Sequence, residues 1–120
     1  MDRVVRCACL FSGVVGLSAC GGLTLPDRAP GIQGEIVGIG PGVPFGSAQA
    51  MWVKETPDEA CGIVFRTTDA EVVVRGGDGG LEPRATSDLT LGMSVRVWFD
   101  AVAESCPGQS DAEVIEIVSE

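Results

Sequence analysis

The side chains that most often carry out chemistry in proteins are scarce in this sequence. Its 120 residues include no His, no Tyr and five Cys, and Lys54 is the one lysine. Without His, a general base near neutral pH has to be a carboxylate, a lysine or a thiolate with a shifted pKa. The adjacent carboxylates of Asp58 and Glu59 lie in the polar stretch TPDEA, and we expect them to point apart on a solvated loop. The sequence therefore predicts no catalytic site and no enzyme.

The sequence has no pattern suited to a zinc, calcium or phosphate site. Zinc sites need clusters of Cys and His, which are missing. In GGDGGLE, residues 76–82, Asp78, Glu82 and backbone carbonyls could approach a calcium ion, but the alternating oxygen ligands of a calcium loop are absent. A flexible hairpin turn is the preferred interpretation. The prolines of GIGPGVPFG, residues 38–46, lack donor amides, and no helix follows to hold a phosphate. We predict no metal and no cofactor.

Cys20 is the residue with the clearest chemical context. A basic head containing Arg3 and Arg6 precedes an uncharged run from residue 7 to 19, and the run ends in Leu-Ser-Ala-Cys at residues 17–20. A helix needs about 20 apolar residues to cross a bilayer, so the run is too short for a permanent anchor. The ending is similar to a bacterial lipobox, in which the cysteine thiol receives diacylglycerol and becomes the first residue of the mature chain.

This interpretation predicts a lipoprotein signal peptide over residues 1–19 and a membrane tether through lipid on Cys20. The protein is then expected in the bacterial cell envelope, lipid-anchored on the extracytoplasmic side of a membrane, which is the outer membrane if the cell has one. An ordinary signal peptide with an incidental cysteine is the alternative.

The remaining cysteines support an exported protein. Removing Cys7 and Cys9 with the signal and assigning Cys20 to lipid leaves Cys61 and Cys106. Two cysteines in an oxidising compartment predict one disulfide, with two buried free thiols as the alternative.

The charge balance argues against nucleic acid as a partner. From Cys20 onward the sequence has 16 acidic and 6 basic side chains. Affinity for nucleic acid comes mainly from Lys and Arg that neutralise phosphates. The acidic mature chain is expected to repel such a backbone.

The mature chain has the length of one domain and reads as all-β. Gly and Pro punctuate residues 20–31, which predicts a flexible linker after the lipidated cysteine. The domain should span residues 32–120, with Gly34 and Gly38 where the sheet can coil tightly. Apolar and alternating runs predict strands over residues 32–39, 50–55, 61–67, 70–75, 94–100 and 112–118. Five or six short strands with these turns indicate a small closed barrel.

The end of the chain resembles a known family. Residues 87–118 contain Asp88, Leu89, Gly92, Val95 and Val97, followed by Glu104, Ser105, Pro107, Gln109 and Ala112. This pattern is similar to the YobA-like family of small bacterial secreted proteins and lipoproteins, a domain of unknown function. Cys106 stands where that family usually has Tyr. The resemblance implies an OB-like β-barrel and brings no established activity.

Candidate binding residues lie before the last strand and on two tryptophans. Glu104, Ser105 and Gln109 occupy a loop of the kind that carries recognition on a rigid barrel, although Glu104 and Gln109 could instead bond the loop backbone and hold the barrel closed. Trp52 and Trp98 are either an exposed platform or core. Two functions follow: a noncatalytic envelope module that binds a protein, peptide or glycan, or a structural or stress-related surface lipoprotein without a specific ligand.

Overall fold

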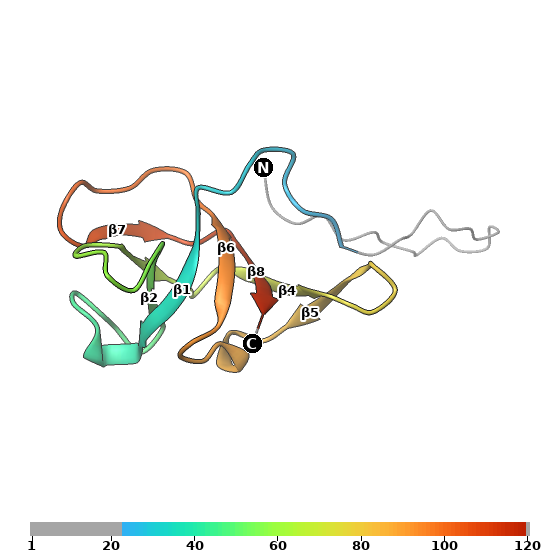
Figure 1. Ribbon diagram of the computed structural model, residues 1–120, viewed down its shortest axis with the longest axis horizontal. Helices are drawn as coiled ribbons and strands as arrows, with labels where there is room; N and C mark the ends of the chain where they lie inside the picture. Colours follow the sequence, from blue (N-terminus) through green and yellow to red (C-terminus); the bar gives the residue numbers. More distant parts are fainter. Residues whose placement is uncertain (1–22, 120) are drawn as a thin grey trace.

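The computed structural model describes residues 23–119 as an all-β domain, which confirms the predicted fold class (Figure 1). Residues 1–22, with the predicted signal peptide and Cys20, lie outside the described residues. The strands are β1 (Ile32–Ile39), β2 (Ala50–Lys54), β3 (Ile63–Arg66), β4 (Glu71–Arg75), β5 (Leu81–Arg84), β6 (Ser94–Trp98), β7 (Gly108–Asp111) and β8 (Val114–Ser119). Two short 3-10 helices, η1 (Gly40–Gly42) and η2 (Thr86–Asp88), follow β1 and β5.

The eight strands form one sheet in the order β5-β4-β8-β6-β1-β2-β3-β7. The sheet is not closed, because its end strands β5 and β7 do not pair with each other, so the expected closed barrel of five or six strands is wrong in this respect. The sheet stays open because the chain bends at two points. The turn at residues 67–70 separates β3 from β4, and residues 112–113 separate β7 from β8. Pairing is therefore divided into a parallel β3·β7 ladder and a parallel β4·β8 ladder.

Six of the eight strands coincide with the runs predicted from the sequence. The other two, β5 and β7, have the sequences LEPR and GQSD and are the edges of the sheet. Proline cannot donate to a ladder and is tolerated at an edge, which explains Pro83 in β5. LEPR is too short to show a clear alternation and GQSD has no large apolar residue, because an edge strand with little buried surface does not need that pattern.

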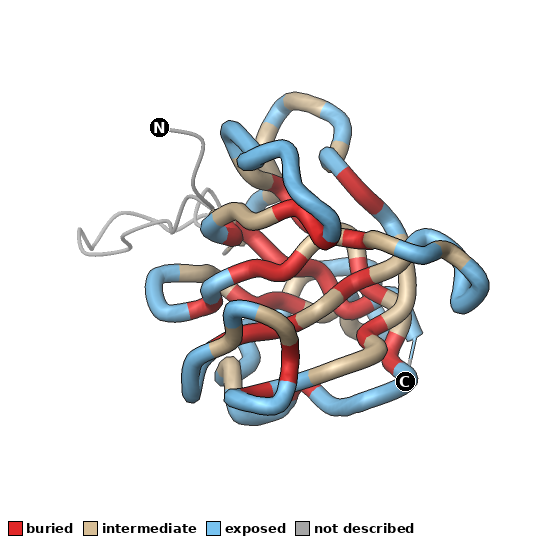
Figure 2. The backbone as a smooth tube through the Cα atoms, turned by 90° about the vertical axis from the view of Figure 1, so that its left-hand side faces the viewer, coloured by how far each residue is buried: buried red, intermediate tan, exposed pale blue. Residues whose placement is uncertain are grey.

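The main core lies on the inner face of the curled sheet. Alternate residues of β6 point inward, so that Val95 and Val97 are fully buried beside Ile115 and Ile117 of β8. Figure 2 shows the buried backbone running through the middle of the domain, with exposed loops around it. The alternation predicted for residues 94–100 is confirmed on this inner face.

Tight coiling of the sheet depends on Gly34. A Cβ atom at Gly34 would collide with the carbonyl of Lys54 on the neighbouring strand. The β1·β2 ladder also shifts register between Ile36 and Gly38. An extra residue in one strand bends it and increases the local twist. Both glycines therefore lie where β1 curves, as the sequence suggested.

The outer face of β6 and β8 is covered by the N-terminal segment, residues 23–30. Leu23 and Leu25 pack against Trp98 and Val114. The Trp98 indole Nε1 donates to the backbone oxygen of Arg28 at 2.7 Å. Most of the predicted linker that the structure describes is thus in contact with the domain.

Arg28 fixes this segment at a second point. Its guanidinium donates to the backbone oxygen of Phe99 at 3.1 Å and to the carboxylate of Glu113 at 2.6 Å. These contacts join residue 28 to the end of β6 and the start of β8.

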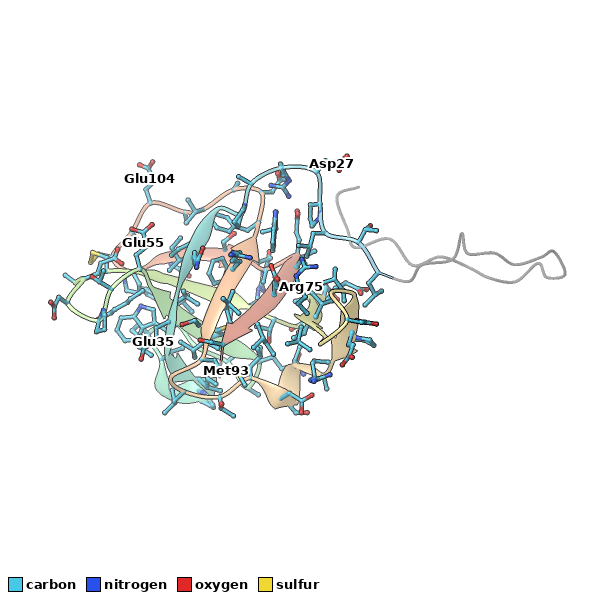
Figure 3. All side chains as sticks on the ribbon, turned by 45° about the vertical axis from the view of Figure 1, so that its right-hand side comes forward. Asp27, Glu35, Glu55, Arg75, Met93 and Glu104 are labelled. Carbon is cyan, nitrogen blue, oxygen red and sulfur yellow. A yellow bond between two sulfur atoms is a disulfide. The ribbon has the colours of Figure 1, made fainter. Side chains whose placement is uncertain are left out.

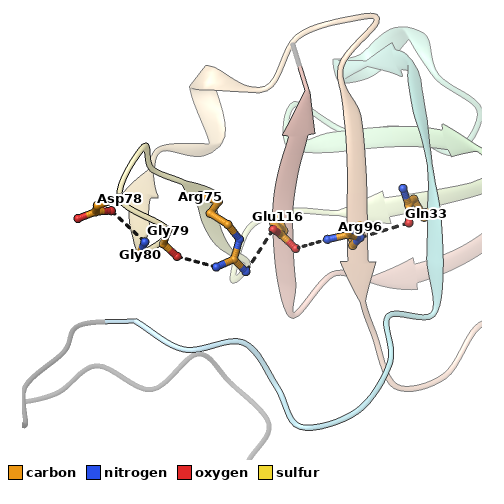
Figure 4. Close-up of polar contacts among 7 residues, drawn as sticks. All are labelled: Gln33, Arg75, Asp78, Gly79, Gly80, Arg96 and Glu116. Atoms are coloured by element: carbon orange, nitrogen blue, oxygen red, sulfur yellow. Dashed lines mark hydrogen bonds and ion pairs between the residues drawn. The ribbon is translucent and has the colours of Figure 1, made fainter.

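A polar network crosses the same outer face beyond Trp98 (Figure 4). The buried carboxylate of Glu116 accepts a hydrogen bond from Arg96 at 3.1 Å, and Arg75 lies 3.8 Å away on its other side. Arg96 also donates to Gln33 at 3.2 Å, and Arg75 donates to the backbone of Gly79 at 2.7 Å. The network ties β1, β6, β8 and the β4–β5 hairpin together.

Candidate functional site

The predicted disulfide between Cys61 and Cys106 is present, with its Cα atoms 4.7 Å apart. It joins the loop between β2 and β3 to the segment before β7. A backbone hydrogen bond from Gly108 to Gly62 at 3.0 Å lies beside it. The link holds the loop of residues 99–107 against the β3 side of the sheet.

The three candidate loop residues lie close together and differ in exposure. Glu104 is exposed and projects away from the domain, as Figure 3 shows. The Ser105 hydroxyl donates to the backbone oxygen of Pro107 at 2.7 Å, and Gln109 Nε2 donates to Ser105 Oγ at 3.4 Å. The Ser105 hydroxyl thus bonds the loop backbone, whereas Gln109 bonds the Ser105 side chain and also lines a groove.

The two tryptophans occupy different environments. Trp98 is core, with 3 % of its surface exposed. Trp52 is half-buried, donates from Nε1 to the Cys61 backbone oxygen at 2.8 Å, and has the Lys54 ammonium 4.6 Å from its ring centre. Neither presents an open aromatic face.

A surface groove of about 370 Å³ opens beside β3 and β7. We call it the Phe45 groove, and it is lined by Phe45, Val64, Arg66, Ala101, Gln109, Ser110 and Asp111. Its floor is the β3·β7 ladder, and its walls come from the loop before β2 and the loop before β7. The lining is mixed, with Phe45, Val64 and Ala101 apolar and Arg66, Gln109, Ser110 and Asp111 polar.

Phe45 is held over this groove by an unusual turn. The Gly46 amide donates to the Val43 carbonyl at 2.9 Å, which closes a β-turn with Pro44 and Phe45 in its centre. Phe45 has a φ of 55°, a left-handed conformation that glycine normally supplies at this position. Its side chain is nonetheless 64 % exposed. The turn thus presents a large aromatic ring to solvent in a strained backbone conformation.

An ion pair faces Phe45 across the groove. Arg66 and Asp111 are direct neighbours in the parallel β3·β7 ladder, and Arg66 Nε donates to Asp111 Oδ1 at 2.7 Å. Both side chains are 68 % exposed. The hydrogen bond to Asp111 and that carboxylate's charge, helped by the charge of Asp69, raise the pKa of Arg66. A guanidinium and a carboxylate are thus both accessible at the groove.

Sequence reasoning missed most of this groove. Arg66 and Asp111 come together through β7, which has no strand pattern of its own. Phe45 had a readable signal, because a large aromatic between Pro44 and Gly46 stands in a loop where little can bury it. Of the candidate binding residues, only Gln109 lies in the groove.

A second cavity of about 270 Å³ lies between the η1–β2 region and η2. Its lining residues are uncharged: Ile39, Ala48, Gln49, Ala50, Met51, Thr67, Thr86, Ser87 and Leu89. Thr67 Oγ1 donates to the Gln49 backbone oxygen at 3.2 Å, so this buried hydroxyl is already satisfied. No group there suggests a particular ligand.

Within residues 23–119, no cluster of three or more His, Cys, Asp or Glu side chains is arranged to hold a metal ion. The same part of the chain contains no helix long and apolar enough to cross a membrane.

The fold and the groove define a small all-β domain stabilised by one disulfide, with a single aromatic ring presented at a polar groove. Residues 48–119 match the family described as "Protein of unknown function (DUF3221)", and the chain belongs to this family. The match agrees with the expectation of a small domain whose function is uncharacterised. No curated protein and no solved structure matches the chain.

Proposed function

We propose that this protein is a lipid-anchored, noncatalytic binding module of the bacterial cell envelope and a YobA-like lipoprotein. Lipid on Cys20 would tether it to a membrane on the extracytoplasmic side. The Cys61–Cys106 disulfide supports this location, because disulfides persist mainly in oxidising compartments. The ligand binds at the loops around the Phe45 groove, and an envelope protein, peptide or glycan is the class of partner expected.

Phe45 is the observation that carries the binding function. A left-handed conformation costs a residue other than glycine about 1 to 2 kcal/mol. The exposed ring returns little of that energy through packing. Backbone strain of this kind concentrates at functional sites. A ring that is costly to place and open to solvent is best explained by a ligand that covers it.

The alternative, a surface lipoprotein without a specific ligand, has support of its own. Ser105 and Gln109 hydrogen-bond within their loop, which is a structural role. That alternative does not explain why Phe45 is both strained and exposed. The acidic sequence continues to argue against nucleic acid as the partner.

Lipid attachment is tested by replacing Cys20 with Ser. A hydroxyl cannot form the thioether to diacylglycerol, so we expect the variant to lose incorporation of radiolabelled palmitate and to accumulate as unprocessed precursor. Palmitate on the Cys20→Ser protein would contradict the proposed anchor.

Ligand binding is tested by capture from a bacterial envelope extract with the disulfide-bonded domain. The wild-type domain and the Leu91→Ala variant should retain the same components, and the Phe45→Gly variant should lose them. Leu91 is a matched control, because it is 65 % exposed and lies outside the groove. Equal capture by all three proteins would remove the groove from the proposed function.

A further inference from the structure

We infer that the Phe45 groove binds one unit of a neutral saccharide with equatorial hydroxyls. One face of the sugar stacks on the Phe45 ring, and its hydroxyls hydrogen-bond to Arg66, Asp111 and Gln109. This inference rests on the proposed binding function and names the ligand class.

The aromatic ring fits a sugar face. Equatorial hydroxyls leave axial C–H groups on both faces of a pyranose, which makes each face apolar while the edge is polar. An exposed ring beside polar groups matches that division, because apolar contact provides area and a few polar groups fix orientation. Val64 lies under the groove floor but is only 5 % exposed, so Phe45 is the main apolar surface of the groove.

The polar groups of the groove fit hydroxyls. The bond between Arg66 Nε and Asp111 Oδ1 uses one donor of a guanidinium that has five, and one oxygen of a carboxylate that has two. Donors and acceptors are therefore offered side by side on two exposed residues. A hydroxyl both donates and accepts, so neighbouring hydroxyls of one sugar can bond to both members of the pair. Gln109 adds an amide oxygen and an amide nitrogen at the same groove.

The charge of the groove selects a neutral ligand. Arg66 and Asp111 cancel each other, and the whole sequence has a formal net charge of −9. An acidic polysaccharide would meet long-range repulsion from the chain. A cationic ligand would have to displace the Arg66 guanidinium from Asp111, which is the one carboxylate among the residues that line the groove.

A peptide could instead bind by adding a strand to β7, but the outward backbone groups of Gln109 are already paired. The Ala103 amide donates to Gln109 O at 2.8 Å, and the Gln109 amide donates to Ala103 O at 3.3 Å. Ser110 Oγ donates to the backbone oxygen of Ala101. Strand addition needs unpaired backbone groups at a sheet edge. Strand addition at Gln109 is therefore blocked, and recognition in the groove relies mainly on side chains, as binding of a saccharide does.

Titration with defined oligosaccharides, followed by NMR of the domain, tests the inference. The probes are chitotetraose and cellotetraose at millimolar concentration, with a galacturonate tetramer as the anionic control. We expect amide shifts at residues 64–66 and 109–111 with the neutral probes and none with the galacturonate. Phe45→Gly should weaken binding by roughly tenfold or more, because the stacking surface is lost.

Two further variants, one inside the groove and one outside it, test whether the groove is the binding site. Asp111→Asn removes a charge and an acceptor and should weaken binding severalfold, while Leu91→Ala should bind as the wild type does. The thermal unfolding midpoint of Phe45→Gly should not fall, because glycine relieves the strained turn, so lost binding is not lost folding.

The outcomes separate this inference from the proposed function. Failure of both neutral probes overturns the saccharide assignment, and the binding function survives if envelope capture still depends on Phe45. Neutral binding that is unchanged in Phe45→Gly overturns the groove as the saccharide site. Capture that depends on Phe45 but is destroyed by protease treatment of the extract shows a protein partner and overturns the saccharide.

Discussion

Glu116 is the one buried charged residue in the part of the chain that the structure describes. Its carboxylate is 3 % exposed, and its partners Arg96 and Arg75 are 37 % and 51 % exposed. Removing one member of a fully buried pair costs about 3 to 5 kcal/mol. The half-exposed arginines regain water, so the loss here is smaller. We expect Glu116→Gln to lower the free energy of unfolding by about 2 kcal/mol.

Urea unfolding checks this value, with Glu82→Gln as the control. Glu82 pairs with Arg84 at 3.5 Å on an exposed hairpin. Exposed pairs contribute about 0 to 1 kcal/mol. Equal shifts of the urea midpoint in the two variants would mean that burial of Glu116 does not matter to stability.

Phe45 gives a second prediction at the residue scale, in the opposite direction. Replacing it with glycine removes the left-handed strain, but glycine also gains freedom in the unfolded chain, worth roughly 0.5 to 1 kcal/mol. We expect Phe45→Gly to leave stability unchanged or to raise it by up to about 1 kcal/mol. A loss of more than about 1 kcal/mol in urea unfolding would mean that the Phe45 ring packs as core.

At the scale of the elements, the loop of residues 99–107 depends on the disulfide. The chain from Cys61 to Cys106 spans 45 positions. The loop-entropy model gives a stabilisation of about 4 kcal/mol for closing a loop of that length, and measured values are often lower. The double variant Cys61→Ala, Cys106→Ala should lose about 2 to 4 kcal/mol of stability.

The loss should be accompanied by local opening of the same loop. The Ala103 and Gln109 amides bond to each other's carbonyls across the loop base. Hydrogen exchange at these two amides should speed up more than at Val97 in the double variant. Unchanged stability and unchanged exchange would show that the ladder contacts alone hold the loop.

The predictable elements are those with a periodic apolar pattern. The runs at residues 32–39 and 94–100 marked β1 and β6 because one face of each is buried in the core. The edge strands β5 and β7 bury little: LEPR is too short to show that pattern and GQSD lacks it, and β7 carries two residues of the groove that sequence reasoning missed. The sequence left open whether Trp98 is core or an exposed platform, and the structure places it on the outer face of β6 under the N-terminal segment. Its burial there could not be predicted, because the cover comes from Leu23 and Leu25, about 75 residues earlier.

At the scale of the molecule, the family match covers fewer residues than the folded domain does. The match begins at residue 48, whereas the described domain includes β1 and the N-terminal segment. β1 lies inside the sheet, between β6 and β2, and contributes Ile32 and Ile36 to the core. Residues 23–30 then cover Trp98 and Val114 on the other face. The matched region is thus part of a larger cooperative unit.

We therefore expect a fragment of residues 48–119 not to fold. Without β1, two internal strands lose their ladder partner, and two isoleucines worth about 1.5 to 3 kcal/mol each are missing from the core. Those losses are comparable to a typical domain stability of about 5 to 15 kcal/mol. A fragment of residues 31–119 should fold with a lower urea midpoint than residues 23–119, because Leu23, Leu25 and Arg28 are absent.

Far-UV circular dichroism and urea unfolding of the three fragments, with the disulfide formed in each, measure this dependence on the N-terminal residues. Adding a peptide of residues 23–47 to the 48–119 fragment should restore a cooperative transition, since the peptide supplies β1 and its cover. In a Trp52→Phe background, acrylamide should quench Trp98 more strongly in 31–119 than in 23–119, because the N-terminal segment shields the indole. Cooperative unfolding of 48–119 alone would contradict the central place of β1, and equal quenching of the two longer fragments would contradict the cover over Trp98.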